Sequence, residues 1–431
     1  MLQTRFHTES SPNFIVYLYP MARNFLIFLF LTFSFHCANS QTQGLDLYIQ
    51  QGLQNSPLLK DYQNQLQSSS LDSILINAQR KPQINAIGQL LVAPAYNGWG
   101  YDGGITNGGN YTGVASASQN IFAKKIYAPQ YEAVSIEKQS ITNTSKISEH
   151  DLRKGIIDQY IVAYSSLNAL TYTETTYKLL KEEEQLLKNF VQQGVYKQTD
   201  YLSFEIAIQS QEIQMKQFQL QYKNDLRQLN LICGINDTAY HILTTPAIQP
   251  QVSEKNNSPF LMQFRVDSLR ITNQKDLVES NYRPRLSWFA DAGFLGSNPA
   301  LLYKNFGTSF GLNFSMPLYD GKQKKLQFQK LSISESTRTN YQQFFKNQYN
   351  QHIVQINMQL AENEQLTEQI QKQLTSSETL ITMSKQLLNK GGLSVTDFII
   401  TIKNYIDVKN QLNQVQLTKL QLISEFNYWN W

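Results

Sequence analysis

The stretch Phe306-Gly-Thr-Ser-Phe-Gly-Leu-Asn-Phe-Ser315, followed by Met316-Pro-Leu-Tyr-Asp-Gly321, decides how the rest of the sequence is understood. Large apolar side chains alternate with glycine and small polar ones. A strand would therefore place Phe306, Phe310 and Phe314 on one face and glycine, serine and asparagine on the other. Strands of about ten residues with this contrast are typical of a transmembrane β-barrel, although a soluble antiparallel sheet with one wet face has the same period.

Three other segments alternate in the same way. Residues 285–294 and 83–90 do so clearly, and residues 111–118 more weakly, with small residues on both faces. The segments 93–110 and 296–305 have no apolar period and are expected to be exposed loops. We therefore expect two hairpins, at about 82–122 and 284–317.

The sequence contains an internal repeat. Gly194-Val-Tyr-Lys-Gln-Thr199-Asp200 corresponds to Gly391-Gly392-Leu-Ser-Val-Thr396-Asp397, displaced by 197 residues. Asn120-Ile-Phe-Ala-Lys-Lys125 corresponds to Pro317-Leu-Tyr-Asp-Gly-Lys322 at the same displacement. The repeats predict one domain at 41–233 with a turn at 194–200, a linker at 234–259, and a second domain at 260–431 with a turn at 391–397.

Each repeat contains a very long expected helix. Residues 130–193 lack proline and contain only Gly155, and residues 322–390 contain neither proline nor glycine. At ~1.5 Å per residue each helix would be roughly 100 Å long, as in coiled coils. After Asp200 one apolar seam includes Phe204, Ile208 and Tyr222, and a second lies on another face at Ile206, Ile213 and Leu220. Two seams require two neighbours, as in a wall of helices.

The N-terminal region indicates export. Met21-Ala-Arg23 precedes an apolar run from Phe25 to Phe35, and Ala38-Asn-Ser40 supplies small residues before Gln41. We predict a signal peptide cleaved between Ser40 and Gln41, with residues 1–20 as an upstream extension. Lipidation at Cys37 is the weaker alternative, because His36 stands where a small residue is normally needed. No later segment approaches ~20 apolar residues.

The composition excludes several classes of function. The formal net charge of +4 comes without a basic cluster interleaved with aromatics, so no nucleic acid is expected as a partner. Cys233 is the only cysteine after the leader, so we expect no internal disulfide. The histidines His150, His241 and His352 are dispersed, and none is expected to have a histidine or a carboxylate four residues away, so no helical metal pair is expected. We expect neither a cofactor nor an enzyme, since no nucleophile, base and orienting group come together.

Four strands cannot close a membrane sheet alone. Lipid offers no hydrogen-bond partners, and the smallest transmembrane barrels have about eight strands. At least two copies are needed, and three would supply twelve strands around a passage.

The two proline-led hairpins, the Pro317-Leu-Tyr-Asp-Gly321 motif and the duplicated Gly-x5-Asp turns resemble the TolC-like outer-membrane efflux protein family over residues 45–428. The resemblance implies a mainly helical protein with β-strands, in which a homotrimer joins a twelve-stranded barrel in the outer-membrane lipid to a periplasmic α-barrel. It also implies two partners, a periplasmic adaptor and an inner-membrane pump, with small molecules or drugs as cargo.

Candidate site residues follow from the turns and junctions. Asp200 and Asp397 are interpreted either as helix caps, together with Thr199 or Thr396, or as a carboxylate ring at the periplasmic mouth. The family's gate implies that role for Asp397, but Leu393 and Ile400 stand where the family has an arginine and a second aspartate, which puts the ion-bridge lock in doubt. Gly194, Gly391 and Gly392 are expected to have φ > 0. Their lack of side chains is also expected to keep the two turns narrow, so that the adaptor can dock there. Pro82, Pro284 and Pro317 are expected at helix–strand junctions.

Two alternatives stay open. The exit duct of a type I protein secretion system would have the same architecture. A soluble periplasmic coiled-coil scaffold or adaptor would explain the helices but not the alternating aromatic strands.

Overall fold

The computed structural model describes residues 44–121, 124–237, 239–251 and 258–431. The expected cleavage site at Ser40 and Gln41, and Cys37 beside it, lie outside this part of the chain. The elements follow in the order α2 Leu45–Asn55, α3 Pro57–Gln79, β1 Gln83–Val92, β2 Gly109–Ile121, α4 Lys124–Gln192, α5 Gln198–Cys233, α6 Pro259–Asn281, β3 Arg285–Gly296, the 3-10 helix η2 Pro299–Lys304, β4 Phe306–Ser315, α7 Gln323–Leu388 and α8 Val395–Trp429. The predicted class, mainly helical with four strands, is confirmed.

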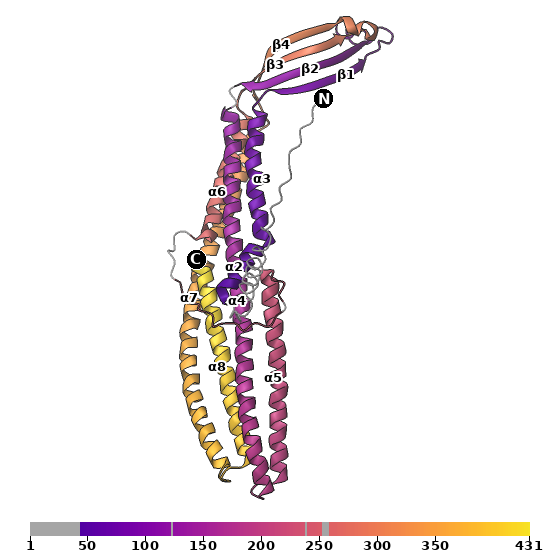
Figure 1. Cartoon of the computed structure of the whole chain (residues 1–431). Helices are drawn as coiled ribbons and strands as arrows, with labels where there is room; N and C mark the ends of the chain where they lie inside the picture. The colour runs from indigo at the N-terminus through magenta and orange to yellow at the C-terminus, as the bar shows by residue number, and fades with distance from the viewer. Residues whose placement is uncertain (1–43, 122–123, 238, 252–257) are drawn as a thin grey trace, which may run out of the picture.

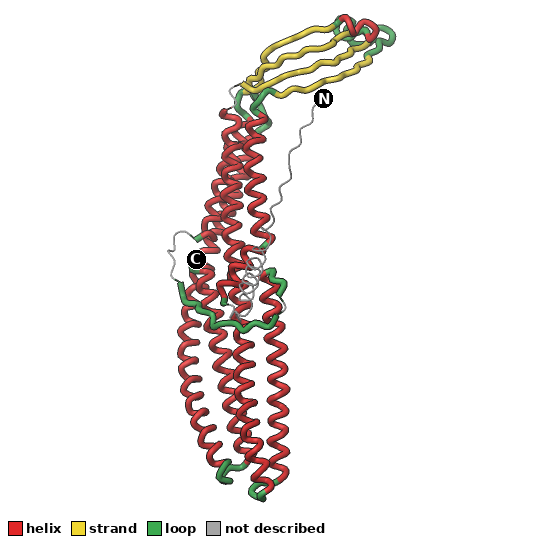
Figure 2. Tube along the Cα trace, in the orientation of Figure 1, coloured by secondary structure: helices red, strands yellow, loops and turns green. Residues whose placement is uncertain are grey.

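The molecule is long, with the sheet at one end and helices along the rest of its length (Figure 1). Next to the sheet, α3, α4, α6 and α7 pack side by side, and farther away α5, α4, α8 and α7 do so. Only α4 and α7 extend through both tiers, and the other helices end or begin near mid-height (Figure 2). The result is an elongated wall of helices, in which α5 also contacts α8.

The long helix α4 begins earlier than expected and contains Pro129 near its start. Proline has no N–H, so the Lys125 carbonyl lacks its usual helical donor. The Arg283 guanidinium supplies one, with Nη1 2.9 Å from the Lys125 oxygen. A side chain from the second repeat therefore stabilises the start of the longest helix of the first.

The apolar seams pack as the core of the wall. On α5, Phe204, Ile208 and Tyr222 are buried. Gln211, a polar residue in the same seam, is buried too, with Nε2 3.4 Å from the Thr173 carbonyl. A second polar residue of this seam, Asp225, accepts a 2.6 Å hydrogen bond from Ser166. Polar residues in the seam are therefore satisfied by the neighbouring helix α4 rather than by water.

The segment after α5 crosses the wall at mid-height without regular structure (Figure 2). Tyr160 of α4 donates a 2.7 Å hydrogen bond to the Thr244 carbonyl, and Asn427 of α8 donates one of 2.9 Å to the Gln249 carbonyl. Hydrogen bonds from both repeats thus fix residues 239–251 across the helices. None of the helices in the described ranges is both long and apolar enough to span a bilayer.

Candidate functional site: a one-sided sheet and a helical tip

The four strands form one antiparallel sheet in the order β1-β2-β3-β4. The register pairs Phe306 with Phe294, Phe310 with Ala290, and Phe314 with Leu286. Directly opposed residues of antiparallel strands point to the same face. The apolar sets of β3 and β4 therefore share one face.

The same register continues across the sheet to β1. Ala290 of β3 pairs with Ala117 of β2, which pairs with Ile84 of β1. One face therefore carries the apolar or small set of every strand, and its large side chains are uncovered, with Phe310 91% exposed. The members of this apolar face with large side chains are Ile84, Leu90, Val92, Tyr111, Ile121, Leu286, Trp288, Phe294, Phe306, Phe310, Leu312 and Phe314.

The opposite face is mainly polar and made largely of small residues, with Ile87, Leu91, Val114, Phe289 and Leu295 as its larger apolar members. It carries Asn85, Ser116, Ser287, Asn313 and their neighbours in the same register. A sheet with one exposed apolar face and one polar face separates a nonpolar medium from water. Its outer strands β1 and β4 each pair on one side only, so both edges are open within this chain.

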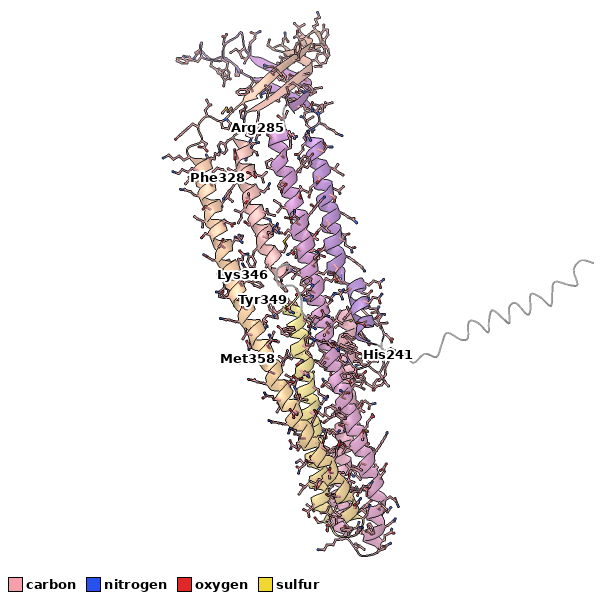
Figure 3. The ribbon with its side chains drawn as sticks, turned by 90° about the vertical axis from the view of Figure 1, so that its left-hand side faces the viewer. His241, Arg285, Phe328, Lys346, Tyr349 and Met358 are labelled. Carbon is pink, nitrogen blue, oxygen red and sulfur yellow. The ribbon has the colours of Figure 1, made fainter. Side chains whose placement is uncertain are left out.

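The three prolines lie at the junctions between helices and strands. Pro82 and Pro284 directly precede β1 and β3, and Pro317 stands between β4 and α7. Arg285 marks the helix-proximal end of the sheet in Figure 3.

The far end of the molecule consists of the two helix turns. Asp200 is the third residue of α5, and its carboxylate accepts a 3.0 Å hydrogen bond from the Lys197 N–H. Asp397 is the third residue of α8, and its carboxylate accepts a 2.7 Å hydrogen bond from the Ser394 hydroxyl. The Ser394 hydroxyl also lies 3.1 Å from the Asp397 N–H. Ser394, which the sequence analysis did not single out, therefore caps α8, and no such bond is found for Thr199 or Thr396 among the described residues.

The expected glycine geometry holds at two of three positions. Gly194 and Gly391 have φ of 77° and 73°, in the left-handed region that favours glycine. Gly392 does not adopt positive φ, so for this residue the expectation is wrong. The reason is local: Gly391 alone makes the left-handed step, and the Gly392 N–H then bonds the Leu387 carbonyl at 2.9 Å.

The two turns contact each other through Tyr196. Its hydroxyl lies 2.9 Å from the Leu388 carbonyl oxygen and 2.8 Å from that of Leu393. Burial, and next the charge of Asp200, raise the pKa of Tyr196, so this phenol stays a donor. Leu393 packs partly buried against the core of the tip, whereas Ile400 is half exposed. Apolar side chains thus occupy both positions at which the family resemblance implies charged ones.

A buried charge lies inside the tip. Glu183 of α4 is 1% exposed, and its Oε1 lies 2.6 Å from Lys385 Nζ of α7. The surrounding core includes Leu180, Leu187 and Phe398. The sequence alone does not reveal this ion pair, because Glu183 lies within three consecutive glutamates that resemble a solvated helix face.

A second polar network joins three helices near mid-height. The Glu425 carboxylate accepts hydrogen bonds from Lys154 (2.9 Å), His352 (3.0 Å) and Trp429 (2.7 Å). Burial opposes ionisation of Glu425, but these three donors together lower its pKa. Burial lowers the pKa of the His150 imidazole, which stacks on Trp431 with ring centres 4.0 Å apart. These groups serve packing between α4, α7 and α8.

One expectation about the histidines is wrong. His241 Nε2 lies 2.8 Å from the carboxylate of Asp237, four residues earlier, in a segment outside the helices. Within the described ranges, however, no three metal-ligating side chains come together.

The outer edges of the helical wall are apolar but uncovered. On α5 the second predicted seam, Ile206, Ile213 and Leu220, is about 60% exposed. On α7, Met358 lies on the free edge in Figure 3 and is similarly exposed. Further exposed apolar residues of α7 are Ile333, Phe344, Leu366, Leu380 and Leu387. Both rows are exposed within the part of the chain that the structure describes.

No family model matches the chain, and no curated protein matches it in sequence. Solved structures match almost all of it. The Campylobacter jejuni CmeC outer membrane channel superimposes with a TM-score of 0.66 at 14% identity, over 89% of this chain and 85% of that chain. The outer membrane protein VceC of Vibrio cholerae gives 0.69 at 13% identity, over 90% and 96%. The Neisseria gonorrhoeae MtrE outer membrane channel, in its open state, gives 0.67 at 12% identity, over 90% and 88%.

The fold is therefore that of outer-membrane channel proteins. The TolC-like fold implied by the sequence resemblance is confirmed.

Proposed function

We propose that the chain is one subunit of a homotrimeric outer-membrane channel. Its sheet would join those of two further copies into a twelve-stranded barrel, and its helices would extend the passage into the periplasm. The observation that carries this proposal is the register, which gathers most of the large apolar residues of the four strands on one face. The likeness to outer-membrane channels supports the same reading.

The strands have the length that a membrane requires. β1 and β4 have ten residues each, about 33 Å when extended at ~3.3 Å per residue. A tilt of about 45° reduces this to roughly 23 Å, close to the ~25 Å apolar band of outer-membrane barrels. Leaving edge N–H and C=O groups unpaired in lipid costs several kcal/mol each, so β4 of one copy must pair with β1 of the next.

The helices require the same ring of copies. The uncovered rows on α5 and α7 lie at opposite edges of the wall in its distal tier. Placing copies side by side would bring the α5 row of one against the α7 row of the next. Each large apolar side chain removed from water there contributes about 1.5–3 kcal/mol if fully buried.

The tip would form the periplasmic mouth. Three copies would bring Asp200 and Asp397 to the opening as six carboxylates, which favour cations. The slim turns at Gly194, Thr199, Gly391, Gly392 and Thr396 would receive a periplasmic adaptor linked to an inner-membrane pump. The chain would reach the outer membrane through its N-terminal leader.

The passage would carry small molecules or drugs outward without chemistry of its own. A type I secretion duct would have the same architecture, and the co-purifying inner-membrane partner, an efflux pump or a protein exporter, distinguishes the two.

The test is fractionation followed by conductance. The expressed chain should sediment with outer membranes, migrate as a trimer in detergent that dissociates on heating, and conduct ions in planar bilayers. A monodisperse monomer that stays folded in detergent-free buffer would contradict the proposal and favour the soluble scaffold.

A further inference from the structure

The membrane part of this chain is almost free of charge. Among all residues of β1, β2, β3 and β4, only Arg285 and Asp291 carry a charged side chain. Arg285 is the first residue of β3, at the end nearest the helices, whereas Asp291 lies in the middle of that strand. Asp291 is therefore the one charged residue in the middle of a strand, and the sheet around it is uncharged up to Arg285 at its end.

The register places Asp291 on the polar face. It pairs with Ser116 of β2 and with Ser309 of β4, and Ser309 Oγ donates to its carboxylate at 3.2 Å. Its neighbours along the strand, Ala290 and Ala292, point to the apolar face. The carboxylate therefore faces the water side of the sheet and not the lipid side.

No fixed cation on the strands lies near enough to neutralise it. Arg285 is six residues away, about 20 Å along an extended strand. That exceeds the Debye length of about 10 Å at 0.1 M salt, so the two charges act independently. The aromatic residue beside it on this face, Phe289, packs against Gly311 of β4, where an added Cβ would lie 2.7 Å from its ring. The ring is thereby held against the adjacent strand.

We propose that Asp291 sets the charge preference of the barrel, so that it favours cations and cationic small molecules over anions. The inference rests on the proposed function, because ring assembly places one carboxylate from each copy at the same height. Three carboxylates roughly 10 Å from the axis, screened at 0.1 M salt, raise the cation-to-anion permeability ratio about two- to five-fold.

The primary test is the reversal potential in planar bilayers under a KCl gradient around 0.1 M. The full-length chain should prefer K⁺ over Cl⁻, and Asp291→Asn should remove at least half of that preference while conductance stays similar. The matched control is Asp102→Asn, which makes the same charge change in the loop between β1 and β2. An unchanged reversal potential in assembled Asp291→Asn overturns the inference. Absence of any conductance in the unmodified chain contradicts the proposed function instead.

A second variant covers the case in which Asp291→Asn fails to assemble. Asp291→Cys introduces a thiol that can be modified in the bilayer by an anionic or a cationic methanethiosulfonate reagent. The native Cys233 is buried, and burial raises the pKa of its thiol to about 12, so it supplies little reactive thiolate. The anionic reagent should restore cation preference and the cationic reagent should reverse it. Identical reversal potentials after both reagents, with labelling verified by mass spectrometry, would rule out a role for this position.

Discussion

At the scale of single residues, Glu183 and Lys385 hold the two repeats together at the tip. The Glu183 side chain is almost fully buried, while that of Lys385 remains partly exposed. Burying a charge without a partner is costly, so the attraction mainly offsets the desolvation of Glu183. Removing only Lys385 leaves that charge uncompensated, which is more damaging than removing both groups.

We therefore expect Lys385→Ala to destabilise the tip by about 3 kcal/mol, roughly 100-fold in local opening. Hydrogen exchange of amides around Leu180 and Leu388 in the detergent-solubilised protein measures this. Lys372→Ala is the control, since Lys372 pairs with Glu368 on the exposed side of the same helix and such pairs contribute at most ~1 kcal/mol. Equal protection losses in the two variants would show that burial of Glu183 has no such effect.

Asp397 combines a local and a proposed global role, and two substitutions separate them. Asp397→Asn retains an oxygen that can accept from Ser394 but removes the charge, so cation preference at the mouth should fall about two-fold while α8 stays intact. Ser394→Ala removes the cap and costs about 1 kcal/mol, with the charge unchanged. Reversal potentials decide between the roles: if Ser394→Ala reproduces the effect of Asp397→Asn, Asp397 acts only as part of the helix cap.

At the scale of elements, the sheet depends on one glycine in β3. Gly293 has φ of 156°, and a Cβ added there would lie 2.3 Å from the Gly113 oxygen and 2.6 Å from Val114 Cα. Both contacts involve the backbone of β2, which cannot move aside without breaking the pairing between the repeats.

Gly293→Ala should therefore abolish the proposed heat-dissociable trimer on gels or reduce its yield at least ten-fold. Gly307→Ala is a close control, because Gly307 is paired with Gly293 and an added Cβ there meets nothing within 4 Å. Wild-type yield for Gly293→Ala would mean that β2 and β3 are not paired in this register.

The elements themselves were largely predictable, but their partners were not. Alternation along 306–315 and 285–294 fixes which residues share a face of one strand, because side chains repeat every two residues. It does not fix the offset between strands, so the apolar face shared by the four strands and the position of Asp291 could only be found from the structure.

Likewise, the repeated turns identified Asp200 and Asp397, whereas their hydrogen-bond partners Lys197 and Ser394 depend on where each helix begins. The pair Glu183–Lys385 joins residues about 200 positions apart and depends on the rotation of two long helices.

At the scale of the whole molecule, the exposed apolar row on α5 can be used to test how copies of the chain contact one another. Ile206→Gln, Ile213→Gln and Leu220→Gln combined should lower the temperature at which the trimer dissociates by at least 10 °C, because several kcal/mol of apolar burial per interface is lost. Helical circular dichroism of the chain should not change, since these side chains are about 60% exposed in the single chain. Lys216→Gln, at another exposed position of α5, should leave dissociation unaltered. The same dissociation temperature in the triple variant would place the contact between copies elsewhere.

The sheet begins with a strand of the first repeat and ends with a strand of the second, in simple sequential order. In a closed ring, the joint between neighbouring molecules would therefore be of the same kind as the joint between β2 and β3 inside one molecule: a second-repeat hairpin beside a first-repeat hairpin. Six hairpins would alternate around the circumference, giving it pseudo-sixfold symmetry. Pairing between strands could add further subunits without limit, so it does not determine how many subunits form the ring. The number of subunits must therefore be set by the curvature of the sheet and the angle between the helical walls.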